Sequence, residues 1–256
     1  MKDKVPKVTS LYKALNLLKY FDHGQKDFGV SELAEKSGLP KSTVHNILQT
    51  FECCGFVTQN YSNNKYSIGI AAVDLFGQYR ASHHIDYRAS LCLREMSEAF
   101  KVNAYLGLKQ GEDVVYLCAE TYHRRKDDEI NRIGARIPLH CTAVGKILLG
   151  YSGIEERTAY YSQPLRSYTP YTITDMNDLR QEVEEDVYRG YALSEQGLME
   201  GVYSLAVPVI VGVEPVMYGI EVSALKPFGD YDLKEILGFM RDKSRIIAGY
   251  FVGSST

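Results

Sequence analysis

The clearest hydrophobic pattern in the chain lies between residues 39 and 51, LPKSTVHNILQTF. Apolar residues recur there three, four and seven positions apart, which places them on one face of a helix: Val44, Ile47, Leu48 and Phe51. The opposite face carries hydrogen-bonding side chains, namely Lys41, Ser42, His45, Asn46 and Gln49. The pattern therefore predicts a helix with one buried side and one row of exposed donors and acceptors.

Two helices are predicted before this one. Residues 8–22 carry an apolar stripe made of Leu11, Ala14, Leu15, Leu18 and Phe21. Residues 31–38 form a shorter amphipathic segment that ends at Gly38, a residue suited to a left-handed C-cap. Only two residues then separate this segment from the next helix. Two short helices joined by a tight Gly-containing turn predict a helix-turn-helix.

A hairpin is predicted directly after the polar-faced helix. Short strands at 56–58 and 65–67 flank Asn63 and Asn64, which tolerate the positive φ angles of a tight turn. A hairpin in this place is a wing, so we expect residues 1–67 to form a winged helix-turn-helix domain. Residues 68–82 keep helical spacing and predict a linker helix. Its apolar surface exceeds what a solvated linker needs, which favours self-association.

The pattern changes from residue 83 onward. Alternating segments predict strand pairs within residues 102–121 and 202–223, and helical spacing predicts helices between and after them. Hairpins and helices mixed in this way give an α+β domain with an antiparallel sheet. We assign this domain to residues 83–256.

Composition narrows the functional classes. The 256 residues are 45% hydrophobic and 24% charged, as in soluble globular proteins. The most apolar run, residues 207–222, is broken by Glu214, Pro215 and Glu221, which argues against a membrane span. The polar N-terminus lacks the apolar core of a signal peptide, so we expect a cytoplasmic protein. Five cysteines without a CxxC pair favour reduced, mostly buried thiols.

The net charge of −3 is unevenly distributed. Residues 1–66 contain nine Lys and Arg against six Asp and Glu, a net charge of +3, and the remaining residues carry −6. This distribution predicts that the basic N-terminal part contacts a polyanion and that the acidic remainder of the chain does not.

Six segments carry a family resemblance: SLYKALNLLKYF, VSELAEKSGLPKSTVHNIL, YSIG, PLHCTAVGKILLG, RGYALSEQGLMEGVYSLAVPV and GIEVS. In their order and coverage of the chain they resemble the IclR family of transcriptional regulators. The resemblance implies a winged helix-turn-helix followed by a GAF-like effector-binding domain, assembled as a dimer or tetramer. It implies a transcriptional regulator whose affinity for double-stranded operator DNA changes when a small metabolite binds. Such a regulator is expected to be a repressor more often than an activator.

The polar helix face and the wing tip supply the predicted DNA contacts. Short hydroxyls at a helix start suit phosphate, and the amides of Asn46 and Gln49 can read adenine. Family members often have Arg at the position of Asn46, so the operator preference of relatives does not transfer. The candidate DNA-binding residues are Lys41, Ser42, Thr43, His45, Asn46, Gln49, Asn64 and Lys65.

Alternation also divides the last strand pair into two faces. One face is apolar, and the other is small and polar, so it either faces water or lines a cavity. Residues 142–145 are expected to start a helix whose free amides form an anion site. By resemblance, the effector lies between these amides and the polar strand positions. The candidate effector-binding residues are Thr142, Ala143, Val144, Gly145, Ser194, Ser204, Glu221 and Ser223.

Glu221 stands at a strand position that is often small and uncharged in the family. An ionised carboxylate disfavours a second carboxylate beside it and favours hydroxyls or an amine. A ligand with an acid end at the helix amides and hydroxyls near Glu221 would satisfy both groups. We therefore predict a sugar or sugar acid as the effector.

Three alternative functions bear on these residues. An enzyme is disfavoured because His140 and Cys141, as neighbours on an extended chain, would point to opposite sides and could not form a nucleophile–base pair; no catalytic residue and no cofactor is predicted. A metal site from His140, Cys141, Cys118 and Glu221 lacks ligand spacing, so none is predicted. The third alternative is a metabolite-binding sensor or interaction module without sequence-specific DNA binding.

Overall fold

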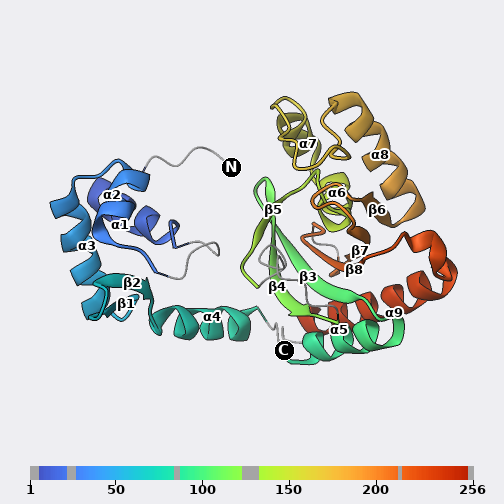
Figure 1. Cartoon of the computed structure of the whole chain (residues 1–256). Helices are drawn as coiled ribbons and strands as arrows, with labels where there is room; N and C mark the ends of the chain where they lie inside the picture. Colours follow the sequence, from blue (N-terminus) through green and yellow to red (C-terminus); the bar gives the residue numbers. More distant parts are fainter. Residues whose placement is uncertain (1–5, 22–26, 84–86, 123–132, 213–214, 253–256) are drawn as a thin grey trace. The chain divides into compact units, whose positions relative to one another are not determined.

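The computed structural model describes residues 6–21, 27–83, 87–122, 133–212 and 215–252. The chain divides into two compact units, Met1–Ser82 and His83–Thr256 (Figure 1).

The first unit is a winged helix-turn-helix followed by a single helix. Its elements are α1 (Thr9–Leu18), α2 (Val30–Ser37), α3 (Lys41–Cys53), β1 (Val57–Asn60), β2 (Lys65–Ile68) and α4 (Ala71–Ser82). Gly38 ends α2 in the left-handed conformation, with φ of 68°, as its position predicts. β1 and β2 pair antiparallel, and Asn64 in the turn between them has φ of 56°. The predicted wing is therefore present.

The core of the first unit lies between the three helices and the wing. Val44, Leu48 and Phe51 of α3 are buried, and Ile47 packs against them, as the spacing predicts. The predicted stripe of α1 is wrong in part, because Leu17 is fully buried while Leu11 and Leu15 are 54% and 51% exposed. α1 carries apolar residues on more than one side, and spacing alone did not identify the side that meets α2 and α3.

The second unit is an antiparallel sheet covered by helices on both faces. Its elements are α5 (Tyr87–Phe100), β3 (Asn103–Gln110), β4 (Asp113–Glu120), β5 (Arg136–Pro138), α6 (Ala143–Gly150), α7 (Ile154–Tyr160), α8 (Met176–Arg189), β6 (Ala192–Glu195), β7 (Tyr203–Val209), β8 (Tyr218–Ala224), the 3-10 turn η2 (Phe228–Asp230) and α9 (Leu233–Val252). The strand order is β5-β4-β3-β8-β7-β6, with all neighbours antiparallel. This agrees with the α+β fold expected from the sequence.

The helices divide between the two faces of this sheet (Figure 1). α5 and α9 pack together against one face, while α6 crosses the other face and packs against α8. α6 lies very close to the turn before it, because a Cβ on Gly145 would fall 2.2 Å from the carbonyl oxygen of Leu139. Glycine at this position therefore lets the first turn of α6 pack directly against the turn that precedes it.

Two further findings concern membranes and cysteines. Within the described ranges, no helix combines the length and apolarity needed to cross a bilayer. Cys92, Cys118 and Cys141 are buried, but Cys53 and Cys54 are exposed at the end of α3. The expectation of buried thiols therefore holds only in the second unit.

Candidate functional site

The first candidate site is the outward face of α3. The predicted side chains Lys41, Ser42, His45, Asn46 and Gln49 are exposed together on this face, and Thr43 is half-buried beside them. No side chain caps the start of α3, which follows Pro40. Its first-turn amides are thus left to pair with solvent or with an anion such as a phosphate.

The wing adds one exposed residue and one residue that is already engaged. Asn64 is exposed at the turn. The ammonium of Lys65 lies 3.3 Å from a Glu32 carboxylate oxygen and 3.7 Å from one of Asp27. A partly exposed pair of this kind contributes little stability, so Lys65 can exchange partners at small cost. The wing tip is nevertheless less positive than the sequence suggested.

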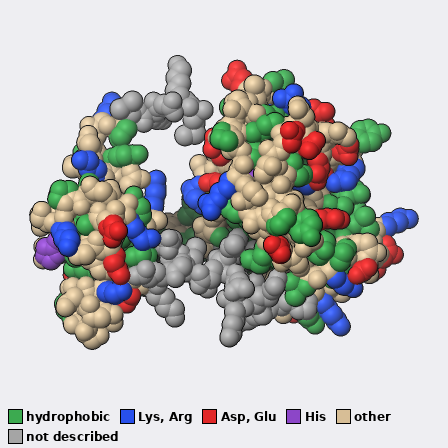
Figure 2. Space-filling view, turned by 45° about the horizontal axis from the view of Figure 1, so that its top comes forward, with side chains coloured by type: hydrophobic (Ala, Val, Ile, Leu, Met, Phe, Trp, Pro, Cys, Tyr) green, Lys and Arg blue, Asp and Glu red, His purple; other side chains and the backbone are tan. Residues whose placement is uncertain are grey.

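Figure 2 agrees with a modest positive charge in this unit. Lys and Arg side chains are spread over its visible face and do not gather into one dense patch. The charge balance of +3 thus provides attraction to DNA without marking where DNA lies.

The second candidate site is a small cavity between the first turn of α6 and the sheet. Five predicted effector residues line it, namely Thr142, Ser194, Ser204, Glu221 and Ser223. The cavity measures about 20 Å³, which is room for about one water molecule. All five residues are less than 9% exposed. The structure thus decides that the polar strand face lines a cavity and is not turned to water.

The expected free amides at the start of α6 are not free, which corrects the prediction of an open anion site. The amide of Val144 donates to Glu221 Oε2 at 2.8 Å, and that of Ala143 donates to Ser204 Oγ at 3.3 Å. The amide of Gly145 donates to the hydroxyl of Thr142 at 3.1 Å, so this threonine is the N-cap. The fold places Glu221 of β8 next to the start of α6. Side chains of the protein itself therefore accept the hydrogen bonds of the first α6 amides.

Among the described residues that line this cavity, Glu221 carries the only carboxyl group. Burial raises its pKa to about 7, and the hydrogen bonds from Val144 and Tyr116, the charge of Lys146 and the Ser204 hydroxyl oppose that rise. The Tyr116 hydroxyl donates to Glu221 Oε1 at 2.8 Å. Near neutral pH this carboxyl group is therefore close to the midpoint of its titration.

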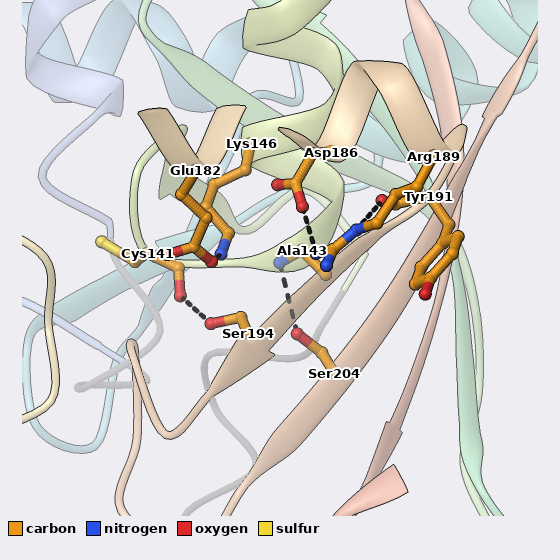
Figure 3. Close-up of polar contacts among 9 residues, drawn as sticks. All are labelled: Cys141, Ala143, Lys146, Glu182, Asp186, Arg189, Tyr191, Ser194 and Ser204. Atoms are coloured by element: carbon orange, nitrogen blue, oxygen red, sulfur yellow. Dashed lines mark hydrogen bonds and ion pairs between the residues drawn. The ribbon is translucent and has the colours of Figure 1, made fainter. Parts of the chain in front are cut away.

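A larger hollow of about 590 Å³ lies between α8, β6 and Lys146 of α6. Within its charged lining, Lys146 is 2% exposed and pairs with Glu182 of α8. The buried Asp186 pairs with Arg189 nearby (Figure 3). Burial raises the pKa of Asp186 to about 6. Ser194 and Gly197 line both spaces, but the other four predicted cavity residues border only the smaller one.

Figure 3 shows how the small cavity is held together. Ser194 points toward the Cys141 carbonyl, to which it donates at 3.0 Å, and Ser204 points toward the amide of Ala143. Strands β6 and β7 are thereby hydrogen-bonded to the segment that leads into α6. The polar strand face, the helix start and the turn before it form one hydrogen-bonded assembly.

Comparison with known proteins identifies the family. Residues 10–60 match the IclR helix-turn-helix domain, and residues 77–248 match the bacterial transcriptional regulator IclR C-terminal domain. The chain belongs to the IclR family. It is 30% identical over 206 residues to the HTH-type transcriptional regulator XynR of Escherichia coli, an alignment that covers 80% of this chain and 81% of that protein.

Other relatives agree with this assignment. The glycerol operon regulatory protein of Streptomyces coelicolor is 28% identical, with 79% of each chain covered. The crystal structure of an IclR regulator from Silicibacter sp. TM1040 superposes with a TM-score of 0.82 at 29% identity, covering 94% of this chain and 96% of that one. This IclR-family protein is therefore a transcriptional regulator, with a DNA-binding helix-turn-helix and a C-terminal effector-binding domain, and the family is not one of enzymes.

The geometry around His140 and Cys141 corrects one step in the sequence argument. Their side chains do meet, with Sγ 3.4 Å from Nε2, because the chain turns at this point instead of running extended. Burial raises the pKa of the Cys141 thiol to about 12, so it is not a ready nucleophile. Both imidazole nitrogens of His140 also contact other groups, the Tyr160 hydroxyl and the Arg166 carbonyl, each at 2.9 Å.

The candidate metal ligands do not form a metal site in the described part of the chain. No group of three or more His, Cys, Asp or Glu side chains is placed there to hold an ion. Glu221 and Cys141 do line the same cavity, but His140 and Cys118 do not join them.

Sequence reasoning missed Tyr116 and the segment that closes the cavity. Leu198, Met199 and Val202, from the loop between β6 and β7, cover the cavity. A Cβ on Gly197 would fall 2.7 Å from the Cys141 carbonyl oxygen, so this loop packs tightly onto the turn. Apolar residues between Gly197 and Gly201 were a usable sign of a buried loop. A tyrosine within an apolar strand is a weaker sign that its hydroxyl has a buried partner.

Proposed function

We propose that this regulator binds its operator through the outward face of α3 and acts as a repressor. A small molecule bound between α6 and the sheet then changes its affinity for DNA. The observation that supports this most strongly is the division of α3, whose apolar side is buried while five hydrogen-bonding side chains stand exposed together. A helix presented in this way after a short Gly turn fits the major groove.

The test is binding of the purified full chain to the intergenic DNA upstream of its own gene. We expect a specific complex that survives competition by random DNA and weakens steeply with added salt, because phosphate contacts release counterions. A reporter placed behind the same DNA should be less active when the regulator is present. Greater activity with the regulator would show activation and reject the repressor assignment.

The effector is proposed to bind in the small cavity and to be rich in hydroxyl groups. Hydroxyls of Ser194, Ser204 and Ser223 line this space with Glu221, and no Lys, Arg or His does so among the residues described there. One relative is named for a glycerol operon, which is consistent with carbohydrate-related control. Substitutions in the cavity should change the ligand response and leave ligand-free DNA binding intact.

Self-association as a dimer or tetramer is proposed from the apolar surface of the first unit. Ile70, Val73 and Leu75 at and within α4 are 70%, 62% and 52% exposed. Leu11 and Leu15 of α1 add to this surface. Dimeric helix-turn-helix proteins bind two operator half-sites that lie about one turn of the DNA helix apart. A dimer therefore also fits DNA binding. We propose that the protein works in the cytoplasm, where the chromosome and small metabolites meet.

The alternative is a sensor that has lost sequence-specific DNA binding. The pairing of Lys65 with Glu32 and Asp27 favours it, because it removes positive charge from the wing. Equal affinity of the purified chain for its own upstream DNA and for random DNA of the same length would establish this alternative.

A further inference from the structure

A row of polar side chains crosses the sheet beneath α6. Ser223 of β8 lies opposite Ser204 of β7, and Ser204 lies opposite Ser194 of β6. The Ser194 hydroxyl donates a hydrogen bond to the Cys141 carbonyl, and the Ser204 hydroxyl accepts one from the Ala143 amide. Ser223 is 6% exposed and lines the cavity, but its hydroxyl forms no hydrogen bond with the residues described. A hydroxyl that faces a cavity without a protein partner is available to a molecule in that cavity, either a water or a hydroxyl group of a ligand.

The place beside Ser223 that would attract an anion is already occupied. The start of a helix carries partial positive charge, and its amides bind carboxylates and phosphates. In α6 this role is filled by Glu221, which is 3% exposed and accepts hydrogen bonds from the Val144 amide and the Tyr116 hydroxyl. An incoming anion would find no free amide there.

The cavity also lacks a positive side chain that could balance a second negative charge. Its described lining contains hydroxyls, a thiol and apolar groups beside Glu221, and no Lys, Arg or His. Lys146, the basic residue of α6, is paired with Glu182 and borders the larger hollow. Two carboxylates a few ångströms apart in a buried site repel strongly, because little solvent screens them.

We propose that Glu221 acts as a resident carboxylate that closes the anion site of α6, so that this regulator responds to a neutral polyhydroxylated molecule and not to a carboxylic acid. Hydroxyl groups of the ligand donate to Glu221 and pair with Ser223, while Leu198 and Met199 contact its carbon skeleton. The present cavity is too small for such a molecule, so the loop between β6 and β7 moves aside when it binds. The inference rests on the proposed location of the effector, and it narrows the predicted sugar or sugar acid to the sugar or polyol.

The first test asks whether Glu221 fills an anion site. The full chain with Glu221→Ala should lose thermal stability and recover several degrees in sodium acetate or formate, relative to sodium chloride at equal ionic strength. Wild type and Glu221→Gln, whose side chain fills the same volume, should respond equally to these salts. Glu221→Ser serves the same purpose if the alanine variant does not fold. Equal responses of wild type and the truncated variants would overturn the proposal.

The second test asks which ligand class the wild type accepts. Calorimetry at pH 8, above the pKa of Glu221, compares pairs in which one CH2OH group is replaced by a carboxylate: glycerol and glycerate, D-glucitol and D-gluconate, and D-glucose and D-glucuronate. We expect the wild type to prefer the neutral member and Glu221→Ala to shift the ratio toward the acid by about tenfold or more, because the repulsion is gone and the Val144 amide is free. Preference of the wild type for an acid, or for D-glucosamine over D-glucose, contradicts the proposal.

A third measurement separates this inference from the proposed function. It follows the operator complex as ligand is added, and Ser223→Ala should weaken binding of the neutral ligand. If a ligand binds with the expected preference but has no effect on the operator complex, the proposed function fails and the ligand class stands. If an acid bound in the cavity controls the operator complex, the proposed function stands and the ligand class fails.

Discussion

At the scale of single residues, the two candidate sites use polar side chains in opposite ways. Asn46 is exposed on a helix whose other face is buried, so its amide is available to any partner that reaches α3. Glu221 is enclosed, and its two oxygens are bonded to Val144 and Tyr116. An exposed amide provides recognition at little cost in stability, whereas an enclosed carboxylate couples the fold to pH.

Replacing Asn46 by Ala should weaken binding to the specific operator by about 1–3 kcal/mol and should barely change binding to random DNA, because a base contact is lost and phosphate contacts remain. Fluorescence anisotropy with the two DNAs at one salt concentration measures this difference. Gln78→Ala, which removes an exposed amide from α4, is the control and should change neither affinity. Losses of equal size on both DNAs would mean that Asn46 does not read bases.

The titration of Glu221 predicts how stability depends on pH. Its pKa is about 7 in the fold and near 4.5 in the unfolded chain, so the folded state keeps a proton that the unfolded state releases between these values. The stabilising contribution is fully present below about pH 4.5 and is lost as pH rises through 7, with a difference of about 3 kcal/mol. Asp186 acts in the same direction, with a pKa of about 6.

Urea unfolding of the second unit at pH 5 and pH 8 measures this effect. Between pH 5 and pH 8, Glu221→Gln should lose less stability than wild type. The loss that remains should be the one caused by titration of Asp186. Glu235→Gln, an exposed position on α9, should keep the full wild-type dependence. A Glu221→Gln variant as pH-sensitive as wild type would mean that this carboxyl group does not titrate in the interval.

At the scale of secondary-structure elements, α6 organises the second unit. All eight of its residues are buried, it crosses the sheet over β7 and β8, and its first turn forms one wall of the cavity. Such a helix tolerates little extra volume, because protein interiors are close-packed. The α4 helix of the first unit is the contrast, since none of its residues is fully buried.

Two glycine substitutions should therefore have opposite effects. Gly145→Ala places a Cβ 2.2 Å from the Leu139 carbonyl oxygen and should destabilise the second unit by roughly 1–3 kcal/mol through overpacking. Gly77→Ala in α4 meets no atom within 4 Å and should stabilise the first unit by about 0.5–1 kcal/mol through helix propensity. Differential scanning calorimetry of each variant gives both values, and a neutral Gly145→Ala would show that α6 can shift.

At the scale of the whole molecule, charge and apolar surface are distributed differently along the chain. Residues 1–66 carry a net charge of +3 and the remainder −6. The exposed apolar residues of α1 and α4 belong to the first unit, which has a small core of its own. This unit has the most to gain from burying surface against another copy.

Self-association should therefore depend on α4. The double variant Val73→Glu and Leu75→Glu places a charge on each of two sides of α4, and it should move the protein toward the monomer because a charge would enter an apolar interface on either side. Sedimentation velocity over a range of concentrations follows the change. The control is the single variant Gln78→Glu. It adds a charge at a polar position of the same helix and should leave the assembly intact. A double variant that assembles like wild type would exclude α4 from the interface.

Several features of this protein were predictable from local sequence. The buried side of α3, the Gly38 cap, the wing around Asn64 and the two central strand pairs follow from spacing and turn chemistry. Alternation along the strands also identified Ser204, Glu221 and Ser223 as one polar face, because alternation is set by backbone geometry, whereas Ser194 was expected only from the family resemblance. β5 was missed, since a strand of three residues is too short to show alternation.

The sequence by itself thus determined the kind of protein: a winged helix-turn-helix, an α+β effector domain and part of the polar lining of each candidate site. Only the tertiary structure decided which partner each polar group takes. It joined Glu221 to the Val144 amide 77 residues away, paired Lys65 with Glu32, and turned Leu17 inward in place of Leu11. These outcomes depend on which distant segments pack together, and spacing along one segment carries no information about its neighbours.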